Sequence, residues 1–382
     1  MITSKQTQSG SELPKSEPYF NPHVEGLPKY NAGLGLAAAR AVSGLEHIAR
    51  LASNENPHGC SPAVHRALAG GSIELWRYSD PNCELLRAAL GSRLGVDPAL
   101  IVVGNGSEEM IAAASRAFLT AGSEALTVAP CFGLHEIEPL AVGARVTKVA
   151  MTVDYEFDLA GLEQALAAAP DVLFLPSPWN PVGAALNRGG LGRLIAATLG
   201  STLFVLDEAY QEFTSDAVPD GLEVLRSSGR AYVVLRTFSK AFGLAGLRVG
   251  YAVCSSPRIA KMLAAAKTPF NVNIVAQAAA LAALADQAWM QKTVAKLCAE
   301  RDRMAKALRA LGLRVARSEG NFLFFDSGRS SAEVATALLK VGVVVKPWLE
   351  PQYQSFIRVS VGTAADNDQF LEALTAILKP TV

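Results

Sequence analysis

Short apolar runs alternate with alanine-rich stretches between about residues 100 and 254, and this alternation limits the possible folds of the 382-residue chain. The runs that predict strands are Ile101–Val103, Ala125–Ala129, Arg145–Val149, Val172–Leu175, Leu203–Leu206, Tyr232–Leu235 and Val249–Cys254. Such runs between helical segments are typical of a buried, largely parallel β-sheet. We therefore predict an α/β fold with a mostly parallel sheet between helices. Ligands bind beyond the carboxyl ends of such strands, so polar residues that follow the runs are site candidates.

The pattern changes near residues 269–273. A long helical region is predicted over 274–311, followed by strand and helix signals at Phe322–Phe325, Ala332–Val341, Val343–Val345 and Phe356–Val361. A chain of this length exceeds one small core, so two domains are expected. We predict a tail or arm over 1–22, the N-terminal part of a smaller α+β domain over 23–50, a large domain over 51–273 and the C-terminal part of the smaller domain over 274–382.

Composition limits the partners and the compartment. Lysine plus arginine and aspartate plus glutamate both count 35, so the formal charge is zero. This balance gives no general electrostatic basis for binding nucleic acid or an anionic membrane. The five cysteines are scattered without zinc-ligand spacing, which favours reduced thiols and no metal. No secretory signal and no apolar run of membrane-spanning length are recognised, so we expect a cytoplasmic protein.

The stretch Leu235–Tyr251, which reads LRTFSKAFGLAGLRVGY, follows an apolar run directly. Lys240 within it is either an ordinary solvated side chain or, if shielded enough to lose its proton, an amine that binds an aldehyde as a Schiff base. Thr237, Ser239 and Arg248 add two hydroxyls and a guanidinium, which are good ligands for a phosphate.

Three further groups follow predicted strands. The turn Gly104–Ser107, with Ser107 predicted as a helix N-cap, suits a phosphate, although such turns are often only structural and this one lacks the Walker and dinucleotide patterns. Asp207 follows Leu203–Leu206 and needs a positive partner if buried; a helix cap or structural ion pair is the alternative. Asn180, in PSPWNPVG, offers an amide, or is simply part of an Asn-Pro turn.

Together these strand-end groups match one ligand. An amine at Lys240, a carboxylate at Asp207 and phosphate donors suit the aldehyde, the cationic ring nitrogen and the phosphate of pyridoxal 5′-phosphate. Asn180 and Tyr210 suit its phenolic oxygen. The sequence therefore predicts a site for this cofactor at the strand ends.

Seven blocks of the chain resemble, in the same order, those of fold-type I pyridoxal-phosphate aminotransferases, and of the histidinol-phosphate aminotransferase branch in particular. The blocks are LASNENPHGCSP, RYSDPN, GNGSEE, SPWNPVG, DEAYQEF, TFSKAFGLAGLRVGY and IRVSVGT, and the resemblance runs from about Val24 to the C-terminus. It implies a cofactor-binding large domain, a homodimer and a transferase of histidine biosynthesis.

The resemblance also implies roles for single residues. Lys240 forms the Schiff base and moves the substrate proton, Asp207 keeps the ring nitrogen protonated, and Tyr210 acts with Asn180 at the phenolic oxygen. The other implied cofactor-binding residues are Gly106, Ser107, Glu108 (through its backbone), Phe132 on the ring, Thr237, Ser239, Arg248 and Tyr78, the last reaching the neighbouring subunit's phosphate. The implied substrate-binding residues are Tyr30, Asn54, Trp179, Lys346 and Arg358.

Some positions depart from the branch's pattern and bear on the substrate. Trp179 replaces a smaller polar residue, Phe132 replaces a commoner tyrosine, and Lys346 stands where a second arginine is common. The sequence Gly133-Leu134-His135 is also unusual, and His135 is not expected to be a catalytic base because Lys240 fills that role.

We predict a ping-pong transaminase that acts on histidinol phosphate and 2-oxoglutarate. Transamination of an aromatic amino acid such as phenylalanine is the close alternative. The same scaffold hosts decarboxylases of phospho-amino acids, which is a second alternative. An aminotransferase-like ligand-binding regulator belongs to another class, and it needs a DNA-binding module for which residues 1–22 are too short.

Overall fold

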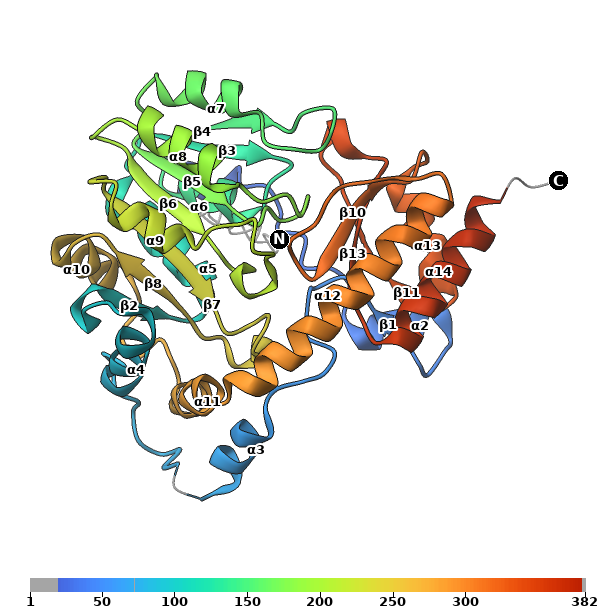
Figure 1. The fold of residues 1–382 in the computed structure, drawn as a ribbon, viewed down its shortest axis with the longest axis horizontal. Coiled ribbons are helices and arrows are strands. Elements are labelled where there is room, and N and C mark those ends of the chain that lie inside the picture. The colour runs from blue at the N-terminus through green and yellow to red at the C-terminus, as the bar shows by residue number, and fades with distance from the viewer. Residues whose placement is uncertain (1–19, 72, 380–382) are drawn as a thin grey trace, which may run out of the picture.

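The computed structural model describes residues 20–71 and 73–379, so most of the predicted tail over 1–22 lies outside the described residues. Two regions lie side by side, one built on a large sheet and one on smaller sheets (Figure 1). Among the described residues, no helix combines the length and the apolar character that crossing a bilayer requires.

A seven-stranded sheet with the order β2-β8-β7-β6-β5-β3-β4 forms the larger region. Its strands are β2 Ile101–Gly104, β3 Glu124–Ala129, β4 Arg145–Ala150, β5 Val172–Pro176, β6 Leu203–Asp207, β7 Tyr232–Thr237 and β8 Gly250–Cys254. Each predicted run matches one strand to within two residues at either end, and the predicted fold class is confirmed. The pairs are parallel except those of β8, which runs antiparallel to both β2 and β7.

Helices cover both faces of this sheet. Successive side chains of a strand point to opposite faces, so Val172 and Phe174 pack in one core cluster while Leu173 and Leu175 pack in another. The first cluster includes side chains of α5 Gly106–Phe118, α6 Leu134–Ala141 and α10 Pro257–Ala266; the second includes α4 Glu84–Leu94, α7 Leu159–Leu166, α8 Arg188–Ala197 and α9 Gly221–Arg226. Burial on both faces explains why the strands other than the exposed edge strand β4 read as apolar runs.

The smaller region contains a four-stranded sheet of order β12-β13-β10-β9 and a parallel pair between β1 and β11. Its elements are α2 Leu36–Ser43, β1 Ala49–Arg50, β9 Arg314–Val315, β10 Phe322–Asp326, α13 Ser331–Lys340, β11 Val343–Val344, β12 Lys346–Pro347, β13 Phe356–Ser360 and α14 Ala364–Leu378. The β1–β11 pair joins the N-terminal segment to the C-terminal part of the chain. The domain boundaries themselves stay a prediction.

The predicted helical region over 274–311 is divided into α11 Ile274–Ala285 and α12 Gln287–Ala310. Asp286 lies between the two helices, and its side chain accepts a hydrogen bond from the backbone N–H of Trp289 at 3.2 Å. This cap starts a new helix in a new direction. The helix α3 Pro62–Ala69 packs against α11.

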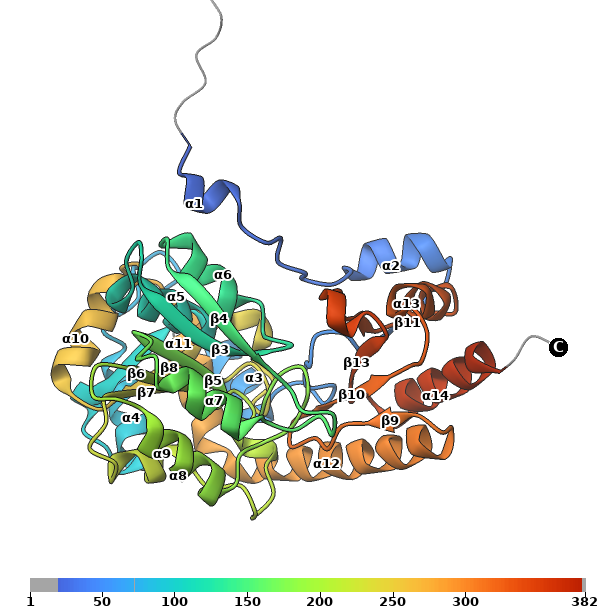
Figure 2. The same cartoon turned by 90° about the horizontal axis from the view of Figure 1, so that it is seen from above.

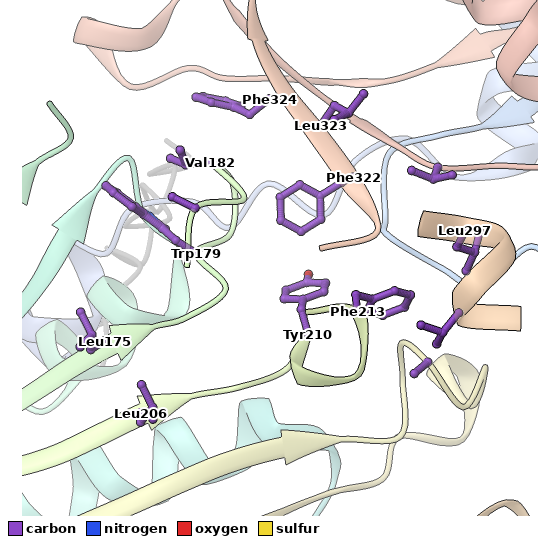
Figure 3. Close-up of a cluster of buried hydrophobic side chains, with 14 of the residues drawn as sticks. Leu175, Trp179, Val182, Leu206, Tyr210, Phe213, Leu297, Phe322, Leu323 and Phe324 are labelled. Atoms are coloured by element: carbon purple, nitrogen blue, oxygen red, sulfur yellow. The ribbon is translucent and has the colours of Figure 1, made fainter. Parts of the chain in front are cut away.

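An apolar cluster connects the two regions behind the strand ends. Figure 3 shows Leu175 and Leu206 of the large sheet, Tyr210 beyond them, and Phe322 of β10 facing Tyr210. The rings of Tyr210 and Phe322 meet edge to face with centroids 5.0 Å apart. This packing brings the smaller region against the carboxyl ends of the strands.

The N-terminal arm, defined here as residues 20–35, crosses from one region to the other. It begins with α1 Pro22–Glu25, which packs against α6, and passes to α2 beside the smaller region (Figure 2). Within the arm, the ring of Tyr30 meets Phe132 edge to face at 6.3 Å between centroids.

Candidate active site

A cavity of about 240 Å³ lies at the carboxyl ends of the strands, between the two regions. Strand β2 points the same way as β7 because both run antiparallel to β8, so the ends of β2, β5, β6 and β7 share one edge of the sheet. The predicted site residues that line the cavity are Tyr30, Asn54, Ser107, Glu108, Phe132, Asn180, Asp207, Tyr210, Thr237, Ser239, Lys240, Arg248, Lys346 and Arg358. Gly106, Tyr78 and Trp179 are not among the lining residues.

One end of the cavity is a cradle of hydroxyl and guanidinium groups. The Thr237 hydroxyl donates to Ser239 Oγ at 3.0 Å, and Arg248 Nη1 lies 3.5 Å from the same Oγ. Arg248 Nη2 also donates to Glu108 Oε2 at 3.1 Å. These donors, at the start of helix α5, form a surface that suits a phosphate.

The glycine turn before α5 makes room for this cradle. Gly106 has a φ of +79°, and a Cβ added there would lie 2.5 Å from Arg248 Nη2. The prediction that Ser107 is the N-cap is wrong, because Asn105 precedes the helix and Ser107 lies in its first turn. The helix starts at Gly106, two residues before the start that an N-cap at Ser107 implies, and the positive φ of Gly106 is one that glycine adopts readily.

Lys240 follows β7 by three residues and extends its amine into the cavity. Its Nζ donates to the carbonyl of Ser53 at 3.1 Å and lies 5.8 Å from the centre of the Tyr210 ring. Burial, and secondly the positive charge of Arg358, lower the pKa of Lys240 to about 8. A fraction of this side chain is therefore a free amine near neutral pH.

Asp207 is the last residue of β6 and has a partner that the sequence did not reveal. His135 Nε2 lies 3.1 Å from Asp207 Oδ2, while Asp207 Oδ1 accepts from the backbone N–H of Ala209 at 3.1 Å. His135 is fully buried on α6. The departure Gly133-Leu134-His135 was the available signal, but nothing in the sequence placed it beside Asp207.

Ser360, which was not predicted as a site residue, helps the predicted residue Asn54 to orient Tyr210. Asn54 Nδ2 donates to the Tyr210 hydroxyl at 2.9 Å, and Ser360 Oγ donates to Asn54 Oδ1 at 2.8 Å. Burial raises the pKa of Tyr210 to about 12, so the phenol keeps its proton and can donate it into the cavity. Ser360 lies in the block IRVSVGT, which the sequence analysis used only for Arg358.

Two further cations, Arg358 and Lys346, face the cavity from the smaller region. Arg358 Nη1 donates to Asn180 Oδ1 at 2.6 Å, Nη2 donates to the carbonyl of Ala52, and its buried Nε has no protein partner among the described residues. Lys346 Nζ donates to the carbonyl of Asn31 at 2.6 Å. Within residues 20–71 and 73–379, neither forms an ion pair with a carboxylate.

The structure corrects the placement of Trp179, which was predicted to contact substrate. Its indole is fully buried, packs on Phe157 at 4.8 Å between centroids, and donates from Nε1 to the carbonyl of Pro130 at 2.8 Å. Figure 3 places it in the apolar cluster with Val182. The large ring is directed into the core, whereas its neighbour Asn180 lines the cavity.

Tyr78 lies on the surface, 83% exposed, and stacks on Phe270 with centroids 4.7 Å apart. It does not line the cavity of its own chain. At this position Tyr78 cannot contact the cofactor site of its own chain, and its predicted contact with the phosphate of a neighbouring subunit stays a prediction.

A shielded lysine, a strand-end carboxylate and a phosphate cradle in one cavity are the arrangement of an aminotransferase. The family model for class I and II aminotransferases matches residues 46–374, and the chain belongs to this family. The predicted resemblance and the predicted enzyme class are thereby confirmed.

Individual relatives are histidinol-phosphate aminotransferases. The one named histidinol-phosphate aminotransferase 3 from Rhizobium meliloti is 41% identical over 355 residues, which cover 93% of this chain and 96% of the relative. The one from Moorella thermoacetica is 35% identical over 387 residues, which cover 99% and 100%. The crystal structure of histidinol-phosphate aminotransferase from Sinorhizobium meliloti in complex with pyridoxal 5′-phosphate superposes with a TM-score of 0.86 at 29% identity, covering 95% of this chain and 98% of that one.

Proposed function

We propose that this chain is a pyridoxal-phosphate-dependent aminotransferase that moves nitrogen between histidinol phosphate and 2-oxoglutarate in a ping-pong reaction. The observation that carries this proposal is the pair of cations Lys346 and Arg358, which share the cavity with the amine of Lys240 and have no carboxylate partner of their own among the described residues. Buried cations without a counter-ion favour an anionic ligand. The names of the relatives support histidinol phosphate as that ligand.

The side chains fit pyridoxal 5′-phosphate. Its phosphate would be held by the cradle residues Ser107, Thr237, Ser239 and Arg248. Gly106 leaves the space that the phosphate needs, because a side chain there would fill the cradle. Asp207 would face the ring nitrogen. Asn180 accepts from Arg358 at Oδ1, and its amide N–H groups, which donate to no other side chain or backbone group among the described residues, could donate to the phenolic oxygen, beside the Tyr210 hydroxyl. When bound, the cofactor supplies an electron sink for the substrate carbon that loses its proton.

The chain's own residues then account for binding and proton movement. Lys240, with a pKa lowered to about 8, presents an amine that would accept the proton of the substrate's α-carbon at Nζ and release it again within the same half-reaction. Arg358 and Lys346 bind the anionic end of either substrate. Tyr30, in contact with Phe132, restricts water at the mouth of the cavity.

Phenylalanine transamination is the second candidate, and one observation favours it. A cavity of about 190 Å³ adjoins the first, shares Tyr30 and Phe132 with it, and has further apolar walls from Ile137, Trp348 and Leu349. An aromatic side chain of a substrate fits such walls.

Steady-state turnover of the two substrates tests the proposal. With 2-oxoglutarate as acceptor, we expect kcat/KM for histidinol phosphate to exceed that for phenylalanine, and Lys240→Ala to abolish both activities and the absorbance of lysine-bound cofactor. A preference for phenylalanine of about tenfold or more, roughly 1.4 kcal/mol in the transition state, contradicts the proposed substrate.

We also propose a homodimer in the cytoplasm. Leu75 and Trp76, close to Tyr78 in the chain, are largely exposed, and a second copy of the chain would cover these apolar side chains. The cysteines are free thiols in the structure, as suits a reducing compartment.

A further inference from the structure

The end of strand β2 and the start of the glycine turn are held by side chains from outside the cavity. Lys267 Nζ donates to the carbonyl of Val103 at 3.3 Å, and Asn271 Nδ2 donates to the same oxygen at 3.5 Å. Two residues further along the chain, the backbone N–H of Asn105 donates to Glu109 Oε2 at 2.6 Å. Backbone groups on both sides of the first glycine of the turn are therefore fixed by side chains that are not among the residues lining the cavity.

The carboxylate of Glu109 joins these contacts into one network. Its Oε2 also accepts from Asn271 Nδ2, and Asn271 Oδ1 accepts from Lys267 Nζ at 2.9 Å. The orientation of the Asn271 amide is determined by these partners, because a carboxylate accepts from the NH₂ group and an ammonium donates to the carbonyl oxygen. The three side chains therefore form a chain of charge-assisted hydrogen bonds that ends on the backbone of the turn.

The segment 267–272, which carries two of these side chains, is itself held in place. The carbonyl of Val272 accepts from Ser79 Oγ at 2.8 Å and from Gln277 Nε2 at 3.0 Å. Within the segment, Phe270 has a φ of +55°, a conformation that costs energy in a residue other than glycine. Such a backbone persists only where the surrounding contacts maintain it. The segment is therefore a fixed support for the turn.

We propose that Glu109 and Asn271 are positioning residues for the phosphate of the cofactor. Among the described residues, the side chain of Asn105 forms no cap hydrogen bond to α5, so Glu109 fixes this turn through the Asn105 N–H instead. The N–H groups in the first turn of the helix then remain available to an anion. A turn that is already formed does not have to be ordered when the phosphate binds, which favours affinity. This inference rests on the proposed cofactor and goes beyond it, because neither residue lines the cavity.

Three substitutions separate these hydrogen bonds from the packing. Glu109→Gln keeps an oxygen that accepts from the Asn105 N–H, whereas Glu109→Met has a similar length and only a thioether, which is a weak acceptor. Asn271→Leu removes the donor to Glu109 at nearly the same side-chain volume. It breaks the network from the other element, so the test does not depend on the folding of a single variant. Apoprotein melting temperatures establish that the variants fold.

The measurement is the dissociation constant of the apoprotein for pyridoxal 5′-phosphate and for pyridoxal, which has the same ring and aldehyde but no phosphate. For pyridoxal 5′-phosphate we expect Glu109→Met and Asn271→Leu to bind about tenfold or more weakly than wild type, about 1.4 kcal/mol. We expect Glu109→Gln to stay within about threefold of wild type. For pyridoxal, all four proteins should bind within about twofold of one another, because the contact with the cradle is absent.

The outcomes are distinct. An equal loss of affinity for both ligands in Glu109→Met and Asn271→Leu, or no loss for either ligand, overturns the positioning role. A loss confined to pyridoxal 5′-phosphate supports it, also where Glu109→Gln shares that loss, because the effect then requires the phosphate. Failure of the wild-type apoprotein to bind pyridoxal 5′-phosphate would overturn the proposed function instead.

Discussion

Single residues in the cavity show an excess of positive charge. Lys240, Arg248, Lys346 and Arg358 all face it, and only Arg248 has a carboxylate partner in the described structure, Glu108. Burial first, and the neighbouring positive charges second, lower the pKa values of Lys240 and Lys346. The free cavity is therefore poised to take up anions.

Lys346 gives the first prediction at this scale. Burial, and then the charges of Arg358 and Lys240, lower the pKa of Lys346 to about 7. Below pH 7 its ammonium is charged and binds an anionic substrate; above pH 7 it loses the proton and this attraction. We expect KM for histidinol phosphate to rise at least about fivefold between pH 6 and 8.5, relative to a Lys346→Arg variant that stays charged.

A Lys346→Met variant sets the other limit for this experiment. Wild-type KM should lie near that of the arginine variant at pH 6 and approach that of the methionine variant at pH 8.5. Ionisation of the substrate phosphate is the same in all three experiments and cancels in the ratios. A constant ratio of wild-type to arginine-variant KM across this range would show that Lys346 does not titrate there.

The residue scale also shows where sequence reasoning ends. Side chains directly after strands, such as Asp207 and Lys240, could be placed in one cavity because parallel strands share an edge. The direction of the Trp179 side chain could not be predicted, because it depends on the path of the turn that follows β5. The contact between His135 and Asp207 joins residues that are 72 positions apart, and only the folded packing of α6 on the sheet brings them together.

At the scale of secondary-structure elements, the turn between β2 and α5 determines the shape of the phosphate cradle. Gly106→Ala adds a methyl group at a positive φ and directly against Arg248. We expect it to lose about 1–2 kcal/mol of stability from backbone strain. We also expect cofactor affinity to fall about tenfold or more, because the Arg248 guanidinium must move away from the phosphate cradle.

Gly122→Ala is the matched control for this turn. Gly122 also has a positive φ, +90°, but nothing lies within 4 Å of an added Cβ. It should lose similar stability in thermal unfolding and keep the wild-type dissociation constant for pyridoxal 5′-phosphate. Equal cofactor affinity in the two variants would show that the Gly106 turn does not shape the cradle.

The elements themselves were largely predictable, and their pairing was not. Strands buried on both faces leave continuous apolar runs, so most strands of the large sheet could be located in this way, whereas the exposed edge strand β4 has alternating polar residues. The antiparallel direction of β8 has no such signal, because its residues read like those of a parallel strand. The pair of Ala49 with Val343 also escaped prediction, since two-residue strands carry almost no periodicity.

At the scale of the whole molecule, a group of aromatic side chains is exposed on the surface of the described residues. Trp76 and Tyr78 are 74% and 83% exposed, close to the exposed Phe270, in a protein whose other large apolar side chains mostly lie in continuous cores. An exposed aromatic group of this kind is consistent with the proposed dimer interface. A symmetric dimer would bury it once in each subunit and could carry Tyr78 to the partner's phosphate cradle.

Mixing two defective variants tests whether Tyr78 acts across that interface. We expect Lys240→Ala to be inactive and Tyr78→Ala to bind the cofactor weakly, each as a homodimer in light scattering. In a heterodimer, the subunit with Tyr78→Ala keeps Lys240 and would receive an intact Tyr78 from the Lys240→Ala subunit. One of its two sites is then complete, so an equal, fully exchanged mixture should recover up to about a quarter of wild-type activity. If Tyr78 serves its own subunit, no complete site can form, and the mixture will stay at the level of the separate variants despite forming heterodimers.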